Sequence, residues 1–217
     1  RIFAHMSNEK NLIDAFNGNM DIHTKTAMDV FHVRENEVTK NMRRQAKAVN
    51  FGILYGMSSF GLAEDLGIDI KSAKSFINDY MKAFPGIDTY KKEVLENAYK
   101  NGYVHTIMNR KRKIDELSNT NYLIRNQGER MAMNTPIQGS SADILKKAMI
   151  DIYEEFNKQK LKSKMILQVH DELIFNVENS EKEKVEKIVI DLMENAYKLN
   201  VPLKVEISEG YSWYDAK

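Results

Sequence analysis

Residues Lys40–Tyr55 read KNMRRQAKAVNFGILY, and this stretch is the most informative guide to the fold. Its length and its alternation of charged and apolar positions predict a helix. The residues expected to form the buried stripe of this helix are Ala46, Val49, Ile53 and Leu54. A second face follows from the four-residue spacing that brings side chains together on a helix, and it would carry Arg43, Lys47, Phe51 and Tyr55.

This second face would present two cations followed by two aromatic rings. Cations suit phosphate groups, and rings suit a base or a sugar, so the face predicts a surface that grips a nucleoside triphosphate along its length. The ordinary alternative is a solvated basic face with aromatic residues that belong to the core. Two features argue against that alternative: the stretch contains no acidic partner at helical spacing, and a separate apolar stripe already supplies the core.

Composition narrows the class of protein. The 217 residues suffice for one large or two small domains, and 42% hydrophobic with 29% charged residues is typical of a soluble globular chain. The net charge of +1 means that attraction to phosphate has to come from local clusters. The absence of cysteine excludes a disulfide scaffold and a thiol nucleophile, and it is consistent with the cytosol. No apolar run reaches the roughly 20 residues of a membrane span, and the N-terminus has no signal-peptide pattern.

Periodicity predicts an α+β fold that is mostly helical. The first part favours helices, a stop at Phe84-Pro85-Gly86 and a small hairpin over Tyr103–Lys113. The second part predicts a long helical stretch that Pro136 and Gly139 kink or split, followed by a short antiparallel sheet. The expected helices are Glu9–Phe16, Ile22–Phe31, Lys40–Tyr55, Ile70–Ala83, Ile87–Lys100, Tyr122–Phe156 and Glu181–Leu199, and the expected strands of the sheet are Met165–Val169, Leu173–Val177 and Leu203–Ile207. The break around Gly56–Gly61 is expected to be irregular.

Two strands frame the acidic tripeptide His170-Asp171-Glu172. Acidic residues at a tight hairpin can simply be turn formers. The functional alternative is a carboxylate at the end of a sheet that binds a divalent metal, because Mg²⁺ usually takes one or two carboxylates together with substrate phosphates. A phosphohydrolase-type site built on His170 and Asp171 would need further ligands, and no other histidine of the chain has metal-ligand spacing.

The segment Arg130–Asp143 is unusually polar for a helix. Arg130, Asn134 and Gln138 recur every four residues, and these side-chain types hydrogen-bond the edges of bases, including the minor-groove acceptors that all base pairs share. The alternative is a solvated stripe near a helix start. The basic run Arg110–Lys113 is offset by nearby acids, and it is interpreted as a solvated surface.

Taken together, three motifs in this order resemble the bacterial family A DNA polymerases. Arg43–Gly56 resembles the nucleotide-binding fingers helix of that family, called motif B. Gln168–Glu172 resembles motif C, a palm hairpin with a catalytic carboxylate, and Arg130–Gly139 resembles the palm helix along the primer–template minor groove. The ending Trp213–Lys217 is also similar to the C-terminus of the family.

The resemblance implies a fingers subdomain over residues 1–124, a partial palm over residues 125–217, and template-directed DNA synthesis in the parent protein. Mg²⁺ is the implied cofactor, with primer–template DNA and a deoxynucleoside triphosphate as partners. The implied nucleotide-binding residues are His23, Arg43, Lys47, Phe51 and Tyr55. Catalytic roles are implied for Asp171, Glu172 and Lys47, with Asp171 as the metal ligand, and contacts to DNA for Arg130, Asn134, Gln138, Gln168 and His170.

One departure from the family pattern concerns the N-terminus. Arg1 resembles the arginine that ends motif A, so the second metal-binding aspartate, like the thumb, is expected to lie on a segment of the same polypeptide outside these residues. We therefore expect the 217 residues alone to be inactive in synthesis. A non-catalytic nucleotide- or nucleic-acid-binding module is the alternative function, and a cytoplasmic location without a membrane is expected in either case.

Overall fold

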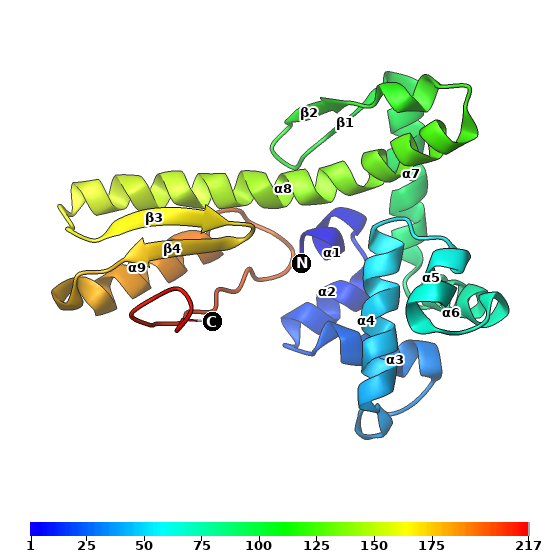
Figure 1. Ribbon diagram of the computed structural model, residues 1–217, viewed down its shortest axis with the longest axis horizontal. Coiled ribbons are helices and arrows are strands. Elements are labelled where there is room, and N and C mark those ends of the chain that lie inside the picture. Colours follow the sequence, from blue (N-terminus) through cyan, green and yellow to red (C-terminus); the bar gives the residue numbers. More distant parts are fainter. Residues whose placement is uncertain (217) are drawn as a thin grey trace. The chain divides into compact units, whose positions relative to one another are not determined.

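The computed structural model describes residues 1–216, apart from the side chain of Leu54. Most of the described chain is helical, and the strands form two small antiparallel sheets (Figure 1), which confirms the predicted α+β class. The chain forms two compact units that divide after Gly139. The predicted subdomain boundary after residue 124 is a different kind of division, and it stays a prediction.

The first unit is helical except for one hairpin. Its helices before the hairpin are α1 (Ile2–Ser7), α2 (Lys10–Asn17), α3 (Ile22–Phe31), α4 (Lys40–Leu54), α5 (Ser59–Leu66), α6 (Ile70–Ala83) and α7 (Pro85–Asn101), with a 3-10 turn η1 (Glu35–Glu37) between α3 and α4. The hairpin consists of β1 (Tyr103–His105) and β2 (Lys111–Lys113), and the 3-10 turn η2 (Asp115–Ser118) follows it.

Helix α4 forms where the sequence predicts it. The Thr39 hydroxyl caps the helix by accepting a hydrogen bond from the Met42 amide at 3.2 Å. Ala46, Val49 and Ile53 are buried, as expected, whereas the fourth predicted member of this stripe, Leu54, has a side chain outside the described residues. The buried stripe packs α4 against α3 and α5, so the opposite face of α4 is open.

The predicted stop at Phe84-Pro85 is also confirmed. Helix α6 ends at Ala83 and α7 begins at Pro85, which suits a first helical position because proline has no amide hydrogen to leave unpaired. Helix α7 ends before Gly102, whose φ of 74° is a left-handed conformation that glycine adopts without a steric penalty. A buried cluster then joins α7, the hairpin, η2 and α8, and its members are Ala98, Val104, Ile114, Leu117 and Ala132.

Helix α8 runs without a break from Tyr122 to Lys158 and carries Pro136 inside it. Of the two expected effects of Pro136 and Gly139, a split of this segment is therefore wrong, and a kink stays a prediction. Pro136 is itself buried, and packing of a continuous apolar and small-residue surface offsets the one backbone hydrogen bond that proline cannot make.

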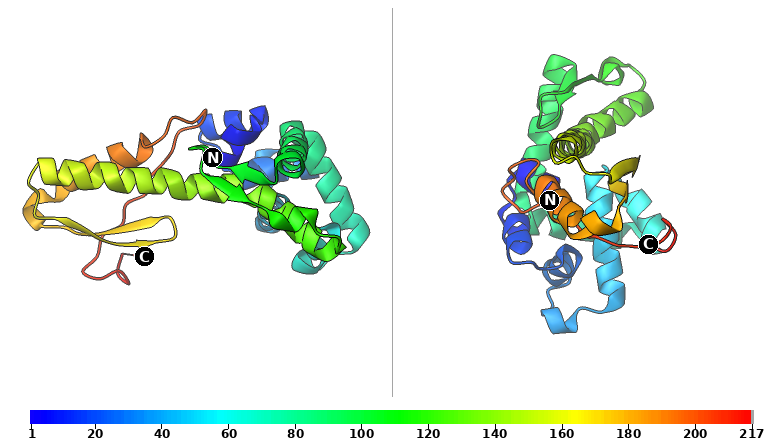
Figure 2. Two further views of the ribbon diagram at one scale, coloured as in Figure 1. Left: turned by 90° about the horizontal axis from the view of Figure 1, so that it is seen from above. Right: turned by 90° about the vertical axis from the view of Figure 1, so that its left-hand side faces the viewer.

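The second unit places a β-hairpin beside the C-terminal half of α8 (Figures 1 and 2). Strand β3 (Lys164–Val169) pairs antiparallel with β4 (Glu172–Asn176), and the register sets Val169 opposite Glu172. After the short turn η3 (Asn179–Glu181), helix α9 (Lys182–Glu194) returns along the hairpin. The buried core of this unit consists of Ile152, Phe156, Leu161, Val185 and Val189, with Leu173 and Phe175 packed against it.

Three local expectations are wrong. Residues 203–207 show the alternating burial of a strand but pair with no other strand in the described part of the chain, so they are not a strand. Helix α9 ends at Glu194 rather than Leu199. The chain breaks between α4 and α5 at Tyr55–Ser58, as expected, but the expectation that Gly61 belongs to this break is wrong, because Ser58 caps α5 and Gly61 continues it. A side chain at Gly61 would approach Met57 to 3.1 Å, so this glycine serves packing rather than a break.

Candidate functional site

The exposed face of α4 carries the predicted aromatic pair. The rings of Phe51 and Tyr55 are stacked, with centroids 6.3 Å apart and planes only 7° from parallel. Their exposed fractions are 43% and 41%, so neither ring belongs to the core. The ordinary interpretation of this spacing as core packing is thereby excluded, and a flat aromatic surface remains open to a planar or sugar-like ligand.

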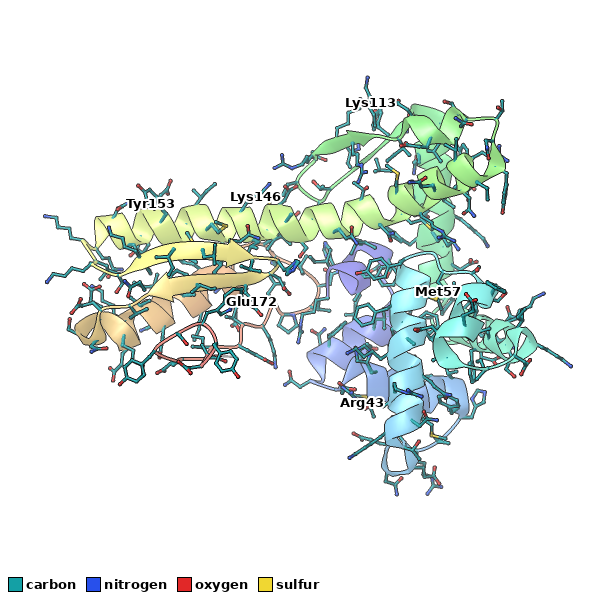
Figure 3. The ribbon with its side chains drawn as sticks, viewed as in Figure 1. Arg43, Met57, Lys113, Lys146, Tyr153 and Glu172 are labelled. Carbon is teal, nitrogen blue, oxygen red and sulfur yellow. The ribbon has the colours of Figure 1, made fainter. Side chains whose placement is uncertain are left out.

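The two cations of the same face differ in their partners. Arg43 (labelled in Figure 3) binds Asp21 through two hydrogen bonds, Nε to Oδ1 at 3.0 Å and Nη2 to Oδ2 at 2.8 Å. Lys47 forms no ion pair with a described residue, and its Nζ lies 6.0 Å from the centroid of the Phe51 ring. The stretch itself has no acidic partner at helical spacing, as the sequence shows, but the N-cap of α3 supplies one to Arg43, whereas Lys47 has none among the described residues.

Asp21 is the N-cap of α3, and the hydrogen-bond donors around it favour the charged form of its carboxyl group. The Asp21 Oδ1 accepts hydrogen bonds from the Thr24 amide at 2.8 Å and the Thr24 hydroxyl at 2.9 Å. Together with the guanidinium of Arg43, which is the largest influence, these donors hold the pKa of Asp21 well below its usual range. The carboxylate is therefore charged at neutral pH, and it fixes the orientation of the Arg43 fork.

His23 lies next to this cluster on α3. Its ring is 6.0 Å from the Phe51 ring, centroid to centroid, and its Nδ1 lies 3.0 Å from the Asn50 Nδ2. Burial is the main cause that lowers the pKa of His23; Arg43 and Lys47 lower it further, and Asp21 opposes them. Burial and the two cations thus favour the neutral imidazole, which can donate one hydrogen bond to an anionic ligand.

The end of α4 abuts α8 within the first unit. Gly56 has a φ of 67°, and a side chain there would approach Met133 Cε to 2.6 Å and Arg130 Cγ to 3.4 Å. Arg130 and Gln138 are exposed on α8, and the partly buried Asn134 has an Oδ1 with no hydrogen-bond partner among the described residues. The aromatic end of α4 therefore lies next to the polar residues that the sequence assigned to base edges.

The acidic hairpin is in the second unit. His170 and Asp171 form the two-residue turn between β3 and β4, and Glu172 begins β4 (Figure 3). His170 has a left-handed φ of 53°, a conformation that costs energy for any residue with a side chain. The Gln168 Nε2 donates a hydrogen bond of 2.6 Å to the His170 carbonyl and so ties down this turn.

The chemistry of Asp171 fits a divalent cation. Asp171 and Glu172 are exposed, and the Asp171 carboxylate makes no hydrogen bond or ion pair with another described residue, so its oxygens are open to a hard cation. The described residues contain no group of three or more acidic or histidine side chains that could enclose an ion.

A helical unit with a cation-and-ring face on α4 is followed along the chain by a β-hairpin that presents Asp171 and Glu172. Residues 1–215 match the family model described as DNA polymerase family A, so the chain belongs to this family. Members of the family use divalent metal ions. No helix among the described residues is long and apolar enough to span a membrane.

The similar proteins agree with this assignment. The chain is 55% identical over 217 residues to DNA polymerase I of Bacillus subtilis and 50% identical to DNA polymerase I of Bacillus caldotenax, in both cases over all of this chain and 25% of the relative. It thus spans about a quarter of the length of the curated relatives it matches. A solved structure of the POL domain of Pol1 from M. smegmatis, in complex with DNA primer-template and dNTP, has a TM-score of 0.95 and 42% identity, covering 99% of this chain and 38% of that one.

The sequence analysis did not identify two residues that lie within hydrogen-bonding distance of Arg43 and His23. Asp21 stands before a helix with a threonine three positions later, which is the pattern of a capping aspartate, but its pairing with Arg43 depends on how α3 packs on α4. Asn50 falls four residues after Ala46, in the otherwise apolar stripe of α4. A polar residue in an apolar stripe is the sequence signal that could have identified Asn50.

Proposed function

We propose that the protein to which these residues belong carries out template-directed DNA synthesis, in the replication or repair of DNA. The single observation that supports this most is the exposed face of α4, where Lys47, which forms no ion pair with a described residue, precedes two stacked rings. The relatives of this chain are DNA polymerases I, and its structural neighbour holds a primer-template and a dNTP. A bacterial enzyme of this kind meets its DNA in the cytoplasm, which is the location that we propose.

In this proposal the α4 face binds the incoming nucleotide. Lys47 and His23 would hold the triphosphate, and Arg43 would join them with the donors that Asp21 leaves free. Phe51 would pack on the sugar and base, and Tyr55 would lie beside the templating base. Along α8, a neighbouring row of polar side chains would contact the terminal base pairs from the minor groove, namely Arg130, Asn134 and Gln138, with further contacts from Gln168 and His170 on the hairpin.

The reaction is an in-line displacement at the α-phosphorus. The primer 3′ oxygen loses its proton to solvent and forms a bond to the α-phosphorus, while the bond to the oxygen bridging the α- and β-phosphates breaks and pyrophosphate leaves. The ammonium of Lys47 would stabilise the negative charge that grows on pyrophosphate. Asp171, with Glu172 beside it, would hold a divalent metal, Mg²⁺ in our proposal. When bound, this ion supplies Lewis-acid stabilisation of the phosphate oxygens.

The experiment uses the full-length protein from the native gene in a primer-extension assay. Lys47→Ala is expected to lower kcat/KM for the nucleotide about ten- to hundredfold, because a hydrogen bond to a charged group is worth roughly 1.5–3 kcal/mol. Arg44→Ala is the matched control, because Arg44 is an exposed cation on the same helix that bonds to Asn41 instead. The affinity for primer–template DNA should be unchanged in both variants.

A second pair of variants tests the hairpin. Asp171→Asn keeps the size of the side chain and removes its charge, so synthesis should be lost while thermal stability is retained. Glu154→Gln is the control, because Glu154 is an exposed carboxylate on α8 in the same unit. The alternative function, a non-catalytic nucleotide- or nucleic-acid-binding module, predicts nucleotide binding without incorporation in the unaltered full-length protein.

A further inference from the structure

His23 belongs to a short chain of hydrogen bonds that continues into the protein interior. The Asn50 Nδ2 lies 3.0 Å from the His23 Nδ1 and 3.0 Å from the Thr26 Oγ1. The Thr26 Oγ1 lies 2.8 Å from the Ile22 carbonyl, one turn back on α3. Thr26 is completely buried, so the Thr26 end of the hydrogen-bond chain is shielded from water. The imidazole of His23 forms the outer end of this hydrogen-bond chain.

The orientation of the Asn50 amide, whose nitrogen faces both His23 and Thr26, sets the direction of this hydrogen-bond chain. The Thr26 hydroxyl has one hydrogen, and the closest acceptor is the Ile22 carbonyl; the Asn50 Oδ1 is farther, at 3.1 Å. With its hydrogen on the carbonyl, the hydroxyl can only accept from Asn50, and it does so from the amide nitrogen. The second hydrogen of that nitrogen then points to the His23 Nδ1. That ring nitrogen has to be an acceptor.

We propose that Asn50 is a positioning residue that holds His23 as the neutral tautomer with its proton on Nε2. The ring then keeps one N–H donor, on the nitrogen that makes no hydrogen bond with a described residue. Such a donor suits an anionic oxygen. This role rests on the proposed function, since it assigns His23 to the triphosphate as a neutral hydrogen-bond donor instead of a cation.

The charges around His23 agree with a neutral ring. Protonation of Nδ1 would set an N–H group against the Asn50 N–H, which breaks the hydrogen bond. Arg43 and Lys47 on α4 also oppose a charge on the ring, while Asp21 on α3 favours it, and burial outweighs the favourable contribution of Asp21. The pKa of His23 is accordingly below its ordinary value.

The tautomer can be measured directly by nitrogen NMR on the 217-residue chain labelled at its histidine rings, with His23→Gln to assign the signals of His23. The expected result is an unprotonated Nδ1 and a protonated Nε2 at neutral pH. Asn50→Asp should reverse the tautomer, because a carboxylate only accepts, and it should raise the pKa of His23 by about one to three pH units. Asn41→Asp is the matched control, because it makes the same change at an exposed site on the same helix.

Thr26→Val provides a milder variant, because it keeps the shape of the buried side chain and removes the hydroxyl that accepts a hydrogen bond from the Asn50 amide nitrogen. It should give a mixture of both His23 tautomers. A proton on Nδ1 in the unaltered chain would overturn the inference, and so would an Nε2–H tautomer that persists in Asn50→Asp. If Asn50 had a purely structural role, Asn50→Asp would leave the tautomer of His23 unchanged.

Titration with dTTP then separates this inference from the proposed function. A response of the His23 Nε2 signal, weakened in Asn50→Asp and not in Asn41→Asp, would support both. If the tautomer is as expected and the Nε2 signal ignores dTTP, the role of Asn50 in setting the tautomer stands, and the assignment of His23 to the nucleotide fails.

Discussion

Arg43 and Lys47 carry the same charge on the same face of α4, yet their surroundings differ. Arg43 is already bound by both oxygens of Asp21, whereas Lys47 has no acidic partner among the described residues. A phosphate group that approaches this face therefore meets Lys47, which has no ion pair within residues 1–216, and Arg43, which has to share its donors. Individual side chains, more than the summed charge of +1, set the affinity of this surface for phosphate.

Tyr55→Ala is expected to impair base selection more than the rate of synthesis in the full-length protein. A ring at the end of α4, stacked on Phe51, shapes the pocket and brings no charge to the reaction. The frequency of misincorporation opposite a defined template base is the measurement. Tyr55→Phe retains the ring and should retain the fidelity, and an unchanged error rate in Tyr55→Ala would contradict a template-side role.

Asp21→Asn should lower the free energy of unfolding at pH 7 by about 1 kcal/mol or less, since the ion pair with Arg43 is largely exposed to solvent. Asparagine is an equally good N-cap, so the variant removes the ion pair and keeps the cap. The pKa of Asp21 is lower in the folded than in the unfolded protein, so its contribution is complete above the unfolded value of about 3.9 and is lost as the pH falls below it.

The check for Asp21→Asn is denaturant unfolding of both proteins between pH 7 and pH 3. The difference in stability should be constant down to about pH 5 and should shrink toward pH 3. A difference that grows on acidification would show that the Asp21 carboxylate is not stabilised by Arg43.

At the scale of elements, the contact between the end of α4 and α8 depends on one glycine. Gly56→Ala should destabilise the protein for two reasons, because alanine disfavours a φ of 67° and because its Cβ would lie 2.6 Å from Met133 Cε. Gly67→Ala is the matched control, since Gly67 has a φ of 65° and no atom within 4 Å of the added Cβ. The control isolates the backbone penalty, roughly 1–2 kcal/mol.

We therefore expect Gly56→Ala to cost more than Gly67→Ala in thermal unfolding, and only Gly56→Ala to weaken nucleotide use by the full-length protein. In a Met133→Ala background, which carries its own cavity cost, adding Gly56→Ala should cost no more than Gly67→Ala does in the unaltered chain. Equal effects of the two glycine substitutions would show that Met133 moves aside without consequence.

The sequence predicted most of these elements because their signals are local. The stop at Phe84-Pro85 was predicted because it depends on adjacent residues, and the caps that the structure shows at Thr39 and Gly102 are equally local. The failures depend on distant partners. Residues 203–207 have a strand pattern but no pairing strand in the described chain, and Gly61 continues a helix because Met57 packs over it.

The same distinction applies to the candidate site. The α4 face and the acidic hairpin were predictable, because each is carried by a contiguous motif with its own spacing. The Asp21–Arg43 pair and the Asn50–His23 hydrogen bond were not, because both join α3 to α4 across more than twenty residues of sequence. Pairings of this kind follow from the packing of two helices, which periodicity in one helix does not determine.

At the scale of the whole molecule, the two compact units have separate buried cores. The core of the second unit includes Ile152 and Val189, whereas the first unit buries Leu62 and Tyr80 among its helices. The proposed nucleotide face belongs to the first unit and the proposed metal carboxylate to the second. The packing of each unit thus stabilises the elements that carry one part of the proposed site.

Hydrogen exchange followed by mass spectrometry can test this division. Ile152→Ala should cost about 2–5 kcal/mol, because it leaves a cavity in a fully buried position. Exchange should accelerate in β3, β4 and α9 and remain unchanged in α3, α5 and α6, since local opening follows the cooperative unit that lost its packing. Leu62→Ala is the reciprocal variant in the first unit, and it should accelerate exchange in α4, α5 and α6 and spare the β3–β4 hairpin. Uniform acceleration across both units in either variant would show that the two cores unfold as one.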